Sequence, residues 1–459
     1  MSSDTIAVTA PFDGRTLGEV PRLDANQVRL EVGIAQQALA TPHEPHERAA
    51  VLERAAVLLA DRHEQFATTI RDEAGKPITL ARAEVDRAID TLRASAIEAR
   101  TLTGQVVPMA GTRVGSVATG FTLRVPTGVV AAITPFNFPL NLSLHKLGPA
   151  IAAGCPVLHK PASSTPLVAV LLRELLLDAG LPSERLRLVT GGGGEVGDAL
   201  ATDPRIRHLS FTGSSDVGWQ LPKRVHRARV SLELGNSTPL LVFADADLDA
   251  VAAAVAAHGY GFAGQSCISV QRVLVERSVY DETVERLTAS VAAVAYGDPA
   301  DEAVVTGPVI DEGARDKVLA TLREAEAAGA RRVVGGDHDG NVIQPTLLVD
   351  VDPSLAVSCQ ELFGPAVVVT PFDGEAEAVA LANGTPYGLQ AGAFTKDVHR
   401  ALRMARELEF GGVTINLSPT FRADQMPYGG VKESGNTKEG PAWAVRELTE
   451  ERLVLLGDG

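Results

Sequence analysis

Apolar residues recur every three or four positions from Asp24 to about Thr103. Residues at this spacing lie on one face of an α-helix, so the pattern predicts a helical opening segment. Gly75-Lys76-Pro77 is the one clear break in the pattern, because glycine and proline both interrupt helices.

The pattern becomes short and β-like between Val107 and Arg124. From Val129 to Glu233, strand-sized apolar runs alternate with helical stretches, which is typical of a parallel sheet covered by helices. We expect strands at Val129–Thr134, Val157–His159, Leu186–Thr190 and His208–Thr212. Thr165 and Pro166 suit the N-cap and the first position of a helix that runs through Leu177.

A second alternating region runs from Leu240 to about Thr414. We expect an alanine-rich helix at Leu248–His258 and strands near Val273 and Val367, and this pattern predicts a second α/β domain. No repeat of fixed period and no low-complexity linker separates the two regions, so the boundary near Gly235 is set by motif.

The net charge of −15 narrows the expected partners. It argues against a nucleic-acid surface and against an anionic membrane. The first residues lack a basic stretch followed by an apolar one, and no later window is long and uncharged enough to span a bilayer, so we expect a cytoplasmic protein. The three cysteines, Cys155, Cys267 and Cys359, are too scattered for a disulfide framework or a zinc site, so we expect free thiols and no metal.

Two glycine-containing loops follow expected strands. The first, TGGGGEVG at 190–197, could hold a phosphate against free backbone N–H groups, and a tight left-handed turn is an equal alternative. In the second, FTGSSDVG at 211–218, Ser214 can cap the next helix while it faces a pyrophosphate. This loop lacks the G-x-G-x-x-G pattern, so an ordinary strand-to-helix turn is its alternative.

Cys267, in the segment GQSCISV, follows a glycine-punctuated stretch and precedes a strand. This context favours a thiol on a loop beside a cleft. A lone cysteine among small residues is more often buried and inert, which is the alternative for Cys267 and the description that suits Cys155 and Cys359.

Glu233 ends an apolar strand in SLELG. If Glu233 is buried there without a partner, its pKa is raised, which suits a general base. A surface-facing residue of an edge strand is a comparable alternative for Glu233. Asn137 lies between two prolines in TPFNFP and offers a neutral N–H donor for an oxyanion. Taken alone, a turn-forming asparagine is the simpler interpretation.

Together these segments resemble the aldehyde dehydrogenase superfamily over essentially the whole chain, in order and at compatible spacing. The matching segments are TPFNFPL from Thr134, HKPASSTP from His159, FTGSSDVG from Phe211, LELG from Leu232, GQSC from Gly264, ELFGP from Glu361 and MPYGGVKESG from Met426.

The resemblance implies an α/β fold with two Rossmann-like parallel-sheet domains and a small β oligomerisation arm. It assigns 1–106 and 125–235 to a nucleotide-binding domain, 236–439 to a catalytic domain, and 107–124 with 440–459 to the arm. The arm would combine the hairpin near Val107–Arg124 with a strand at Arg452–Leu456. Because a lone hairpin is marginally stable in water, pairing with a second subunit is reasonable, and a homodimer or homotetramer is expected.

By the same resemblance, Cys267 is the nucleophile, Glu233 is the base for the hydrolytic water, and Asn137 with the Cys267 backbone N–H forms the oxyanion hole. The thiolate would add to an aldehyde, the oxyanion would collapse by passing hydride to a nicotinamide, and water would release the carboxylate from a thioester. The cofactor-binding residues that the resemblance implies are Thr134, Phe136, Lys160, Ser163, Gly213, Ser214 and Glu361.

The sequence departs from the family pattern at three of these places. Ser163 stands where NAD-specific members usually carry glutamate, and its hydroxyl removes the repulsion of a 2′-phosphate beside Lys160. We therefore expect NADP to be accepted alongside NAD, with NADP a candidate for the preferred cofactor. Phe136 replaces the usual tryptophan and lacks its N–H donor, and Asn236 replaces a common glycine.

The segments GQSCISVQR and FRADQMPYGG resemble the branch that handles lactaldehyde, glyceraldehyde 3-phosphate, phosphonoacetaldehyde and similar short polar aldehydes. Arg422 would then meet a substrate anion, and an ion pair with Asp424 or another local carboxylate is an equal alternative. Arg272 is expected to be structural.

Two other functions stay open. A coenzyme A-acylating dehydrogenase would pass the thioester to a thiol, although the presence of Glu233 argues against it. A catalytically silent relative on the same fold is the second alternative, and the joint presence of Cys267, Glu233 and Asn137 argues against that.

Overall fold

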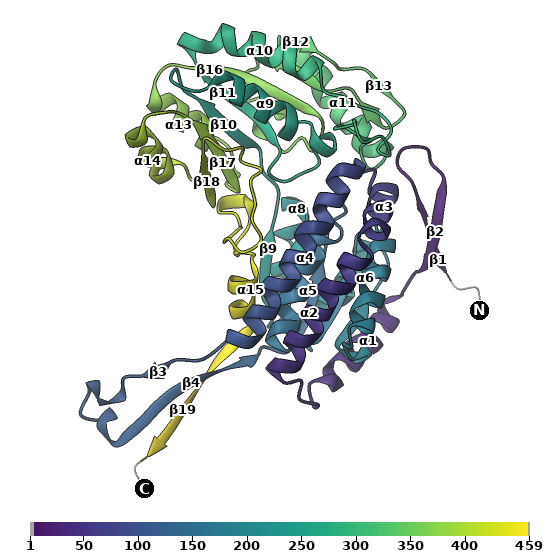
Figure 1. Cartoon of the computed structure of the whole chain (residues 1–459), viewed down its shortest axis with the longest axis vertical. Helices are drawn as coiled ribbons and strands as arrows, with labels where there is room; N and C mark the ends of the chain where they lie inside the picture. The colour runs from purple at the N-terminus through teal and green to yellow at the C-terminus, as the bar shows by residue number, and fades with distance from the viewer. Residues whose placement is uncertain (1–3, 458–459) are drawn as a thin grey trace.

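The strand-sized apolar runs between Val129 and Glu233 form one five-stranded parallel sheet in the computed structural model, which describes residues 4–457 (Figure 1). In spatial order the strands are β7 (Leu186–Leu188), β6 (Val157–Lys160), β5 (Val129–Ile133), β8 (Ile206–Thr212) and β9 (Arg229–Glu233). The four predicted strands are thus present, with ends shifted by up to two residues.

The side chains of β5 point alternately to the two faces of this sheet, and each face is covered by its own set of helices. Val130 and Ala132 pack in one core, whereas Val129 and Ala131 pack in another, because successive side chains of a strand point to opposite faces. The first core is closed by α2 (Pro45–Asp61), α3 (His63–Ala74), α4 (Ile78–Thr101), α5 (Asn141–Ala153) and α6 (Leu167–Asp178). The second is closed by α1 (Ala25–Ala38) and the short α7 (Asp198–Thr202).

The helical opening segment and its break at Gly75-Lys76-Pro77 are confirmed, but the expectation of one break is wrong. Besides the break at Gly75-Lys76-Pro77, the chain leaves the helix between Ala38 and Pro45 and again at Arg62, where one helix ends and the next begins. Proline at 42 and 45 explains the first additional break, since proline cannot donate within a helix. The hairpin of β1 (Thr5–Thr9) and β2 (Thr16–Pro21) precedes these helices and is not predicted from the sequence.

The start of α6 differs from the prediction in a way that local sequence cannot reveal. The helix begins at Leu167, and the Thr165 hydroxyl is buried without a hydrogen-bond partner instead of capping the helix. The carboxylate of Glu73, from α3, accepts the N–H groups of Leu167 at 2.8 Å and Val168 at 3.0 Å. Burial raises the pKa of Glu73 to about 8. A residue distant in sequence therefore caps this helix.

The second alternating region forms a seven-stranded sheet. In spatial order its strands are β12 (Arg331–Val334), β15 (Thr346–Val349), β16 (Ala366–Phe372), β11 (Val270–Glu276), β10 (Thr238–Val242), β17 (Gln390–Phe394) and β18 (Gly412–Ile415), all parallel except β12. Its two faces are covered by α9 (Leu248–His258) and α10 (Tyr280–Ala292), and by α11 (Glu312–Ala327), α13 (Glu375–Asn383) and α14 (Val398–Glu407). The helix predicted at Leu248–His258 and the strands near Val273 and Val367 are confirmed.

The chain then returns to the first sheet through residues 416–440, here called the return segment. Leu234 N–H donates to Ser434 O at 3.0 Å, and Glu233 forms a β-bridge with Gly435, so this segment runs beside the end of β9. The helix α15 (Pro441–Glu447) follows and packs against α5. The return segment therefore joins the two sheets near the end of β9.

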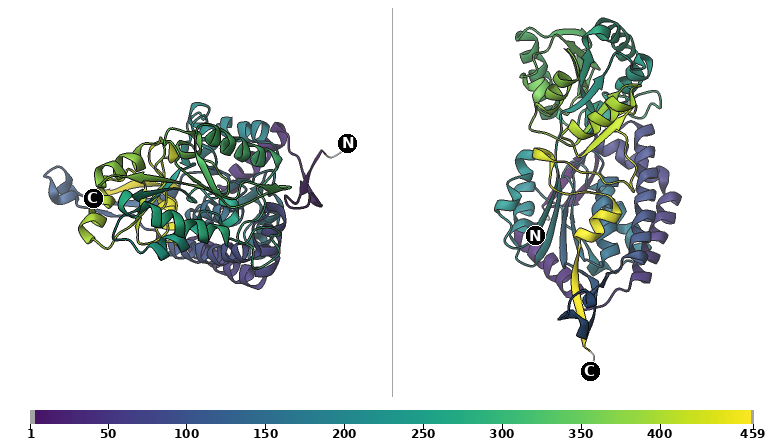
Figure 2. Two further views of the ribbon diagram at one scale, coloured as in Figure 1. Left: turned by 90° about the horizontal axis from the view of Figure 1, so that it is seen from above. Right: turned by 90° about the vertical axis from the view of Figure 1, so that its left-hand side faces the viewer.

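A three-stranded antiparallel arm projects from the body (Figures 1 and 2). It consists of β3 (Val106–Val107), β4 (Ala118–Pro126) and the C-terminal β19 (Thr449–Gly457), with Leu453 opposite Thr122. The expected pairing of the hairpin with the C-terminal strand is present. No helix within residues 4–457 is long and apolar enough to cross a membrane.

The Glu73 cap makes a prediction about stability. Glu73→Ala leaves two buried N–H groups without an acceptor and should lower the free energy of unfolding by about 2 kcal/mol. Glu73→Gln keeps a carbonyl oxygen at the same place and serves as the control, which should lose much less. The melting temperatures of the three proteins measure this, and equal values for alanine and wild type would remove the cap as a stabilising contact.

Candidate active site

The predicted cofactor-binding residues lie at the carboxyl ends of three neighbouring strands. Thr134 follows β5, Lys160 ends β6, and Gly213 follows β8. The chain passes from β5 to β6 and β7 on one side and then crosses from β7 to β8 on the other side of β5, so the direction of winding reverses between β5 and β8. A crevice at such a switch point is the usual ligand site of an open α/β sheet.

The residues after β5 and β6 already have protein partners. Thr134 Oγ1 lies 3.0 Å from His159 Nε2, and Ser163 Oγ donates to Gly191 O at 3.1 Å. The second bond brings the four-glycine loop beside Ser163. Lys160 is buried, its Nζ donates to Pro161 O at 3.3 Å, and burial lowers its pKa to about 8. Its charge therefore has no carboxylate to compensate it.

The FTGSSDVG loop is fixed by its backbone. Gly213 N–H donates to Glu233 O at 3.1 Å, and a Cβ on Gly213 would lie 2.5 Å from the ring of Phe211. Ser214 occupies the N-cap position of α8 (Ser215–Gly218), as predicted, but its side chain makes no capping hydrogen bond. The Ser214 hydroxyl is thus not used by the helix.

The second sheet contributes residues to the same region. Glu361 Oε1 accepts the Asn236 N–H at 3.2 Å, and burial raises the pKa of this carboxyl to about 7. Phe136, from the loop after β5, packs edge-to-face against Phe363 with ring centres 5.9 Å apart. Loops of both sheets therefore meet here.

The loop that carries Cys267 is held by an unusual backbone turn. Phe262, Ala263 and Gly264 have φ values of 52°, 54° and 67°, in the left-handed region that costs non-glycine residues about 1–3 kcal/mol each. Surrounding contacts compensate this cost, among them the bond from Phe262 N–H to Val305 O at 3.0 Å. The turn delivers Cys267 to the wall of a cavity between the two sheets.

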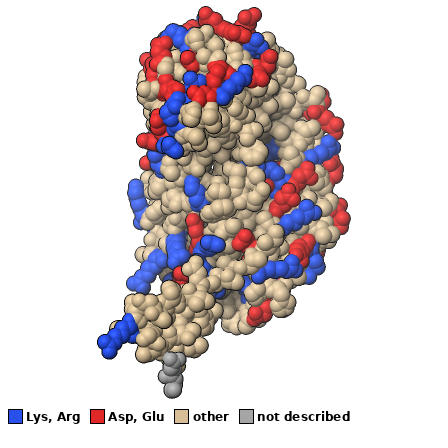
Figure 3. Space-filling view, turned by 60° about the vertical axis from the view of Figure 1, so that its left-hand side comes forward, with Lys and Arg blue, Asp and Glu red and all other residues tan. Residues whose placement is uncertain are grey.

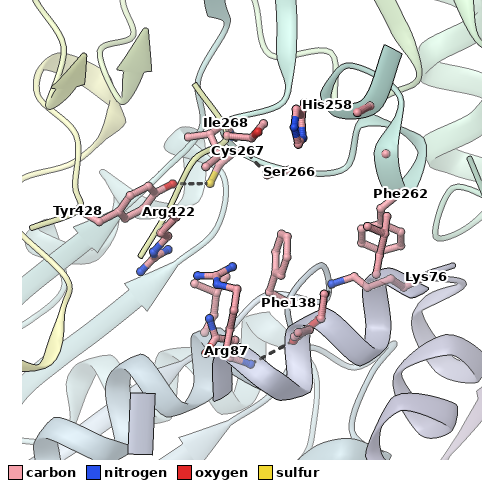
Figure 4. A pocket seen from close by; sticks show the side chains of 18 residues that line it. Lys76, Arg87, Phe138, His258, Phe262, Ser266, Cys267, Ile268, Arg422 and Tyr428 are labelled. Atoms are coloured by element: carbon pink, nitrogen blue, oxygen red, sulfur yellow. Dashed lines mark hydrogen bonds and ion pairs between the residues drawn. The ribbon is translucent and has the colours of Figure 1, made fainter. Parts of the chain in front are cut away.

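This cavity has a volume of about 290 Å³ (Figure 4). Its walls include Cys267, Arg87, Arg422, Phe138, His258 and Tyr428. The thiol Sγ lies 2.9 Å from the Tyr428 hydroxyl. Burial, partly offset by this hydrogen bond, raises the pKa of Cys267 to about 12. The thiol therefore faces a cavity of small-molecule size.

Asn137 and Glu233 converge on the Cys267 loop from the first sheet. Asn137 Nδ2 donates to Gln265 O at 2.9 Å, while its Oδ1 is buried without a partner. Glu233 is buried, and neither carboxylate oxygen has a hydrogen-bond partner. Burial and the nearby charge of Glu439 raise the pKa of Glu233 well above its usual value. β9 is an edge strand, as the alternative for Glu233 supposed, but Glu233 does not face the surface, because the return segment covers this strand end.

A set of buried charges next to Glu233 is missed by sequence reasoning. Lys146 Nζ lies 3.0 Å from Glu439, and Asp424 lies 2.8 Å from His145 and 2.9 Å from Arg87. The sequence contained a sign of two of these residues, because His145 and Lys146 are titratable side chains in an otherwise apolar helix, and that helix is buried on all sides. Their partners in the return segment have no such local pattern.

Arg422 has features of both alternatives considered from the sequence, an ion pair with a local carboxylate and a position facing the substrate. It pairs with Glu439 at 2.9 Å, whereas Asp424 is occupied by Arg87 and His145. Its guanidinium carbon also lies 3.7 Å from the centre of the Tyr428 ring, and its buried Nε has no partner on the cavity wall. Arg422 is thus an ion-paired residue that still lines the cavity.

Arg272, Asn236 and the other cysteines have structural surroundings. Arg272 donates only to the main-chain carbonyls of Ser237, Leu381 and Ala382. Asn236 Nδ2 donates to Thr238 Oγ1 at 2.8 Å and to Gln390 O at 3.0 Å. The thiols are all free. No cluster of three potential metal ligands occurs among the described residues.

Comparison with known proteins agrees with this geometry. The model of the aldehyde dehydrogenase family matches residues 1–454. The chain belongs to the aldehyde dehydrogenase family. The prediction of an aldehyde-oxidising enzyme is thereby confirmed, and so is the predicted fold.

Several relatives align over almost the whole chain. The chain is 42% identical to a 3-sulfolactaldehyde dehydrogenase of Priestia megaterium, over 99% of this chain and 95% of that protein. It is 36% identical to a lactaldehyde dehydrogenase of Methanococcus vannielii, over 99% of this chain and 97% of that protein. Both relatives act on short, polar aldehydes, as their names state.

Two solved structures are similar over the full length. One is the glyceraldehyde-3-phosphate dehydrogenase GapN of Methanocaldococcus jannaschii in complex with NADP, with a TM-score of 0.96, 34% identity and 100% of both chains covered. The other is an NADP-dependent glyceraldehyde-3-phosphate dehydrogenase of Bacillus halodurans in complex with NADP, with a TM-score of 0.97 and 34% identity, covering 100% of this chain and 97% of that one.

Proposed function

We propose that this aldehyde dehydrogenase oxidises a short anionic aldehyde to the carboxylate, with Cys267 as nucleophile, Asn137 as oxyanion donor and Glu233 as base. The observation that carries the proposal is the cavity, whose wall contains one cysteine, Cys267, and two arginines, Arg87 and Arg422. Membership of the aldehyde dehydrogenase family supports the oxidation of an aldehyde, and the arginines that line the cavity support an anionic substrate.

The first step follows from the position of Cys267. Its thiolate adds to the aldehyde carbon, a C–S bond forms, and the π electrons of the carbonyl move to its oxygen. Asn137 Nδ2 and the Cys267 backbone N–H are neutral donors suited to this oxyanion. Asn137 is already oriented toward the Cys267 loop through its bond to Gln265 O. Loss of hydride from the former aldehyde carbon leaves a thioester on Cys267.

Hydrolysis of the thioester requires a base. Glu233, with both oxygens free and a raised pKa, can take a proton from water as the water attacks the thioester carbon. The C–S bond then breaks, which returns Cys267 as the thiolate and releases the acid, and the acid loses its remaining proton to solvent to become the carboxylate. The cations Lys146, Lys438 and Arg422 favour the charged form of Glu233 and so limit the rise in its pKa.

The crevice at the switch point suits a nicotinamide dinucleotide, NAD or NADP, which supplies the ring that accepts the hydride. The buried, uncompensated Lys160 favours an anionic or hydroxylated ligand, and Glu361 retains Oε2 as an acceptor for ribose hydroxyls. We propose contacts from Thr134, Phe136, Gly213 and Ser214 in the same crevice. Ser163 supports acceptance of NADP, as do the NADP-bound structural relatives.

The substrate class is proposed from the cavity walls. Arg87 and Arg422 lie on the same cavity as Cys267, and each has a buried Nε without a partner (Figure 4). Both guanidinium groups are ion-paired, to Asp424 and to Glu439, but a buried N–H that lacks an acceptor is costly, so the two Nε–H groups favour an anionic ligand. A tail such as the sulfonate of 3-sulfolactaldehyde, the substrate named for one relative, has this chemistry.

The arm supports a homodimer or homotetramer. β19 is an edge strand, and Leu453, Leu455 and Leu456 on it are each more than half exposed. Figure 3 shows an arm whose visible face is free of charged side chains except near its tip. Unpaired edges with apolar side chains favour pairing with another strand, so we propose that a second copy covers this arm.

We also propose the division into a nucleotide-binding and a catalytic domain near Gly235. It is supported by the end of β9 at Glu233 and the start of β10 at Thr238, which belong to different sheets. The free cysteines and acidic composition support a cytoplasmic enzyme, which cell fractionation would test.

The catalytic roles predict two different failures. Cys267→Ala should abolish aldehyde oxidation while binding of NAD(P) persists, and Glu233→Gln should give one rapid burst of absorbance at 340 nm followed by stalled turnover. Cys359→Ala, at a partly buried cysteine that does not line the cavity, is the control and should keep full activity. Oxidation by the Cys267 variant would end the proposal, and activity that requires coenzyme A would replace hydrolysis by acyl transfer.

The anion-binding proposal predicts a selective effect of Arg87. Arg87→Met should lower kcat/KM for an aldehyde with a sulfonate or phosphate tail by about tenfold or more, since a hydrogen bond to a charged group is lost. It should change kcat/KM for neutral lactaldehyde much less. Arg93→Met, on the exposed side of the same helix, is the matched control. Equal losses with charged and neutral aldehydes would contradict the proposal, and running the panel with both NAD and NADP measures the cofactor preference.

The arm proposal predicts a change in assembly. Leu453→Asp together with Leu455→Asp should convert an oligomer of the wild type into monomers, measured by sedimentation. Val398→Asp, on α14 and also exposed, should leave the assembly unchanged. A monomeric wild type, or an intact oligomer in the double variant, would show that the arm does not carry the interface.

A further inference from the structure

The Tyr428 hydroxyl is in contact with the Cys267 thiol, although the proposed reaction gives Tyr428 no role. Its side chain is buried, and its hydroxyl lies 2.9 Å from Cys267 Sγ (Figure 4). Within residues 4–457 this is the one side-chain hydrogen bond that Sγ makes, and the hydroxyl makes no other. The contact therefore joins the two groups as a pair.

The position of Tyr428 is fixed by the return segment. Its backbone N–H donates to Glu439 O at 3.1 Å in an isolated antiparallel bridge. Arg422 stacks on one face of the ring and is itself tied to Glu439 at 2.9 Å. Three groups of one segment thus hold the phenol rigidly, so little rotamer entropy is lost when its hydroxyl bonds to sulfur.

The thiol needs a donor at this place. Cys267 lies near the carboxylates Glu233 and Glu361, and both of them and burial disfavour a negative sulfur. Among the groups that face Sγ, Arg422 acts through charge at a distance, whereas the Tyr428 hydroxyl lies within hydrogen-bonding distance. Either atom can donate while Cys267 is a thiol, but a thiolate can only accept, so the hydroxyl is the donor to the ionised sulfur. Burial raises the pKa of Tyr428 well above its ordinary value, so the phenol keeps its proton and stays a donor.

We propose that Tyr428 is a further catalytic residue, whose hydroxyl donates to the Cys267 thiolate and stabilises it against burial. The proposal rests on Cys267 as the nucleophile. As the sulfur lone pair forms the C–S bond with the aldehyde carbon, the hydrogen bond weakens, and the phenol keeps its proton throughout. When the thioester is cleaved and the thiolate leaves, the hydroxyl donates to sulfur again.

The test is the pH dependence of Cys267 alkylation by iodoacetamide, followed by mass spectrometry of the Cys267 peptide. Tyr428→Phe keeps the ring and its stacking on Arg422 but removes the donor. The alkylation rate at each pH below the thiol pKa should fall about tenfold, which corresponds to a rise of about one unit in the pKa of Cys267. Tyr260→Phe is the matched control, because that buried hydroxyl donates to Thr346 O at 3.0 Å, away from Cys267.

A second variant should change the pKa of Cys267 in the opposite direction. Incorporation of 3,5-difluorotyrosine at position 428 makes the phenol a stronger donor, so this pKa should fall and neutral-pH alkylation should accelerate. An unchanged profile in Tyr428→Phe, or no change with the fluorinated ring, would overturn the proposal. Aldehyde oxidation by the Cys267→Ala variant is the separate result that would overturn the nucleophile itself.

Discussion

The ion pairs that bind the return segment to the first sheet are the contacts on which the site depends. Glu439 pairs with Lys146 of α5 and with Arg422, and Asp424 pairs with Arg87 of α4. His145 of α5 adds a hydrogen bond to Asp424, and burial lowers the pKa of this histidine to about 4, so it is neutral near pH 7. Removing charges from water is costly, and loss of one partner leaves the other unpaired in a buried site. The pairs therefore hold the return segment in one position, and with it Tyr428 and Arg422, which line the cavity with Cys267.

The two sheets contribute different parts of the site. Strand ends of the first sheet present Thr134, Lys160 and Gly213, all at one edge, because parallel strands share their direction. The second sheet presents Cys267 on a loop whose left-handed turn no regular element could replace. The cavity lies where these two sets of loops meet, so its shape depends on how the sheets are joined.

Much of this arrangement could be predicted from the sequence, and the remainder could not for physical reasons. Alternation and helical spacing identify both sheets because they report burial on one face of an element, which is a local property. The cap of α6 by Glu73 and the pairing of Asp424 with Arg87 join residues far apart in sequence, and no local pattern records them. The motif around Cys267 identified its loop, but not the hydroxyl of Tyr428 beside it.

The cavity wall is built from elements that are independent of one another along the chain. Arg87 lies on α4, whereas Cys267 lies on a loop that is closed by its own turn and by contacts within the second sheet. A change at position 87 alters the lining of the cavity without passing through the backbone that holds the thiol. Substitutions on α4 that keep a partner for Asp424 can therefore change which aldehyde is accepted, while the loop that presents the nucleophile stays unchanged.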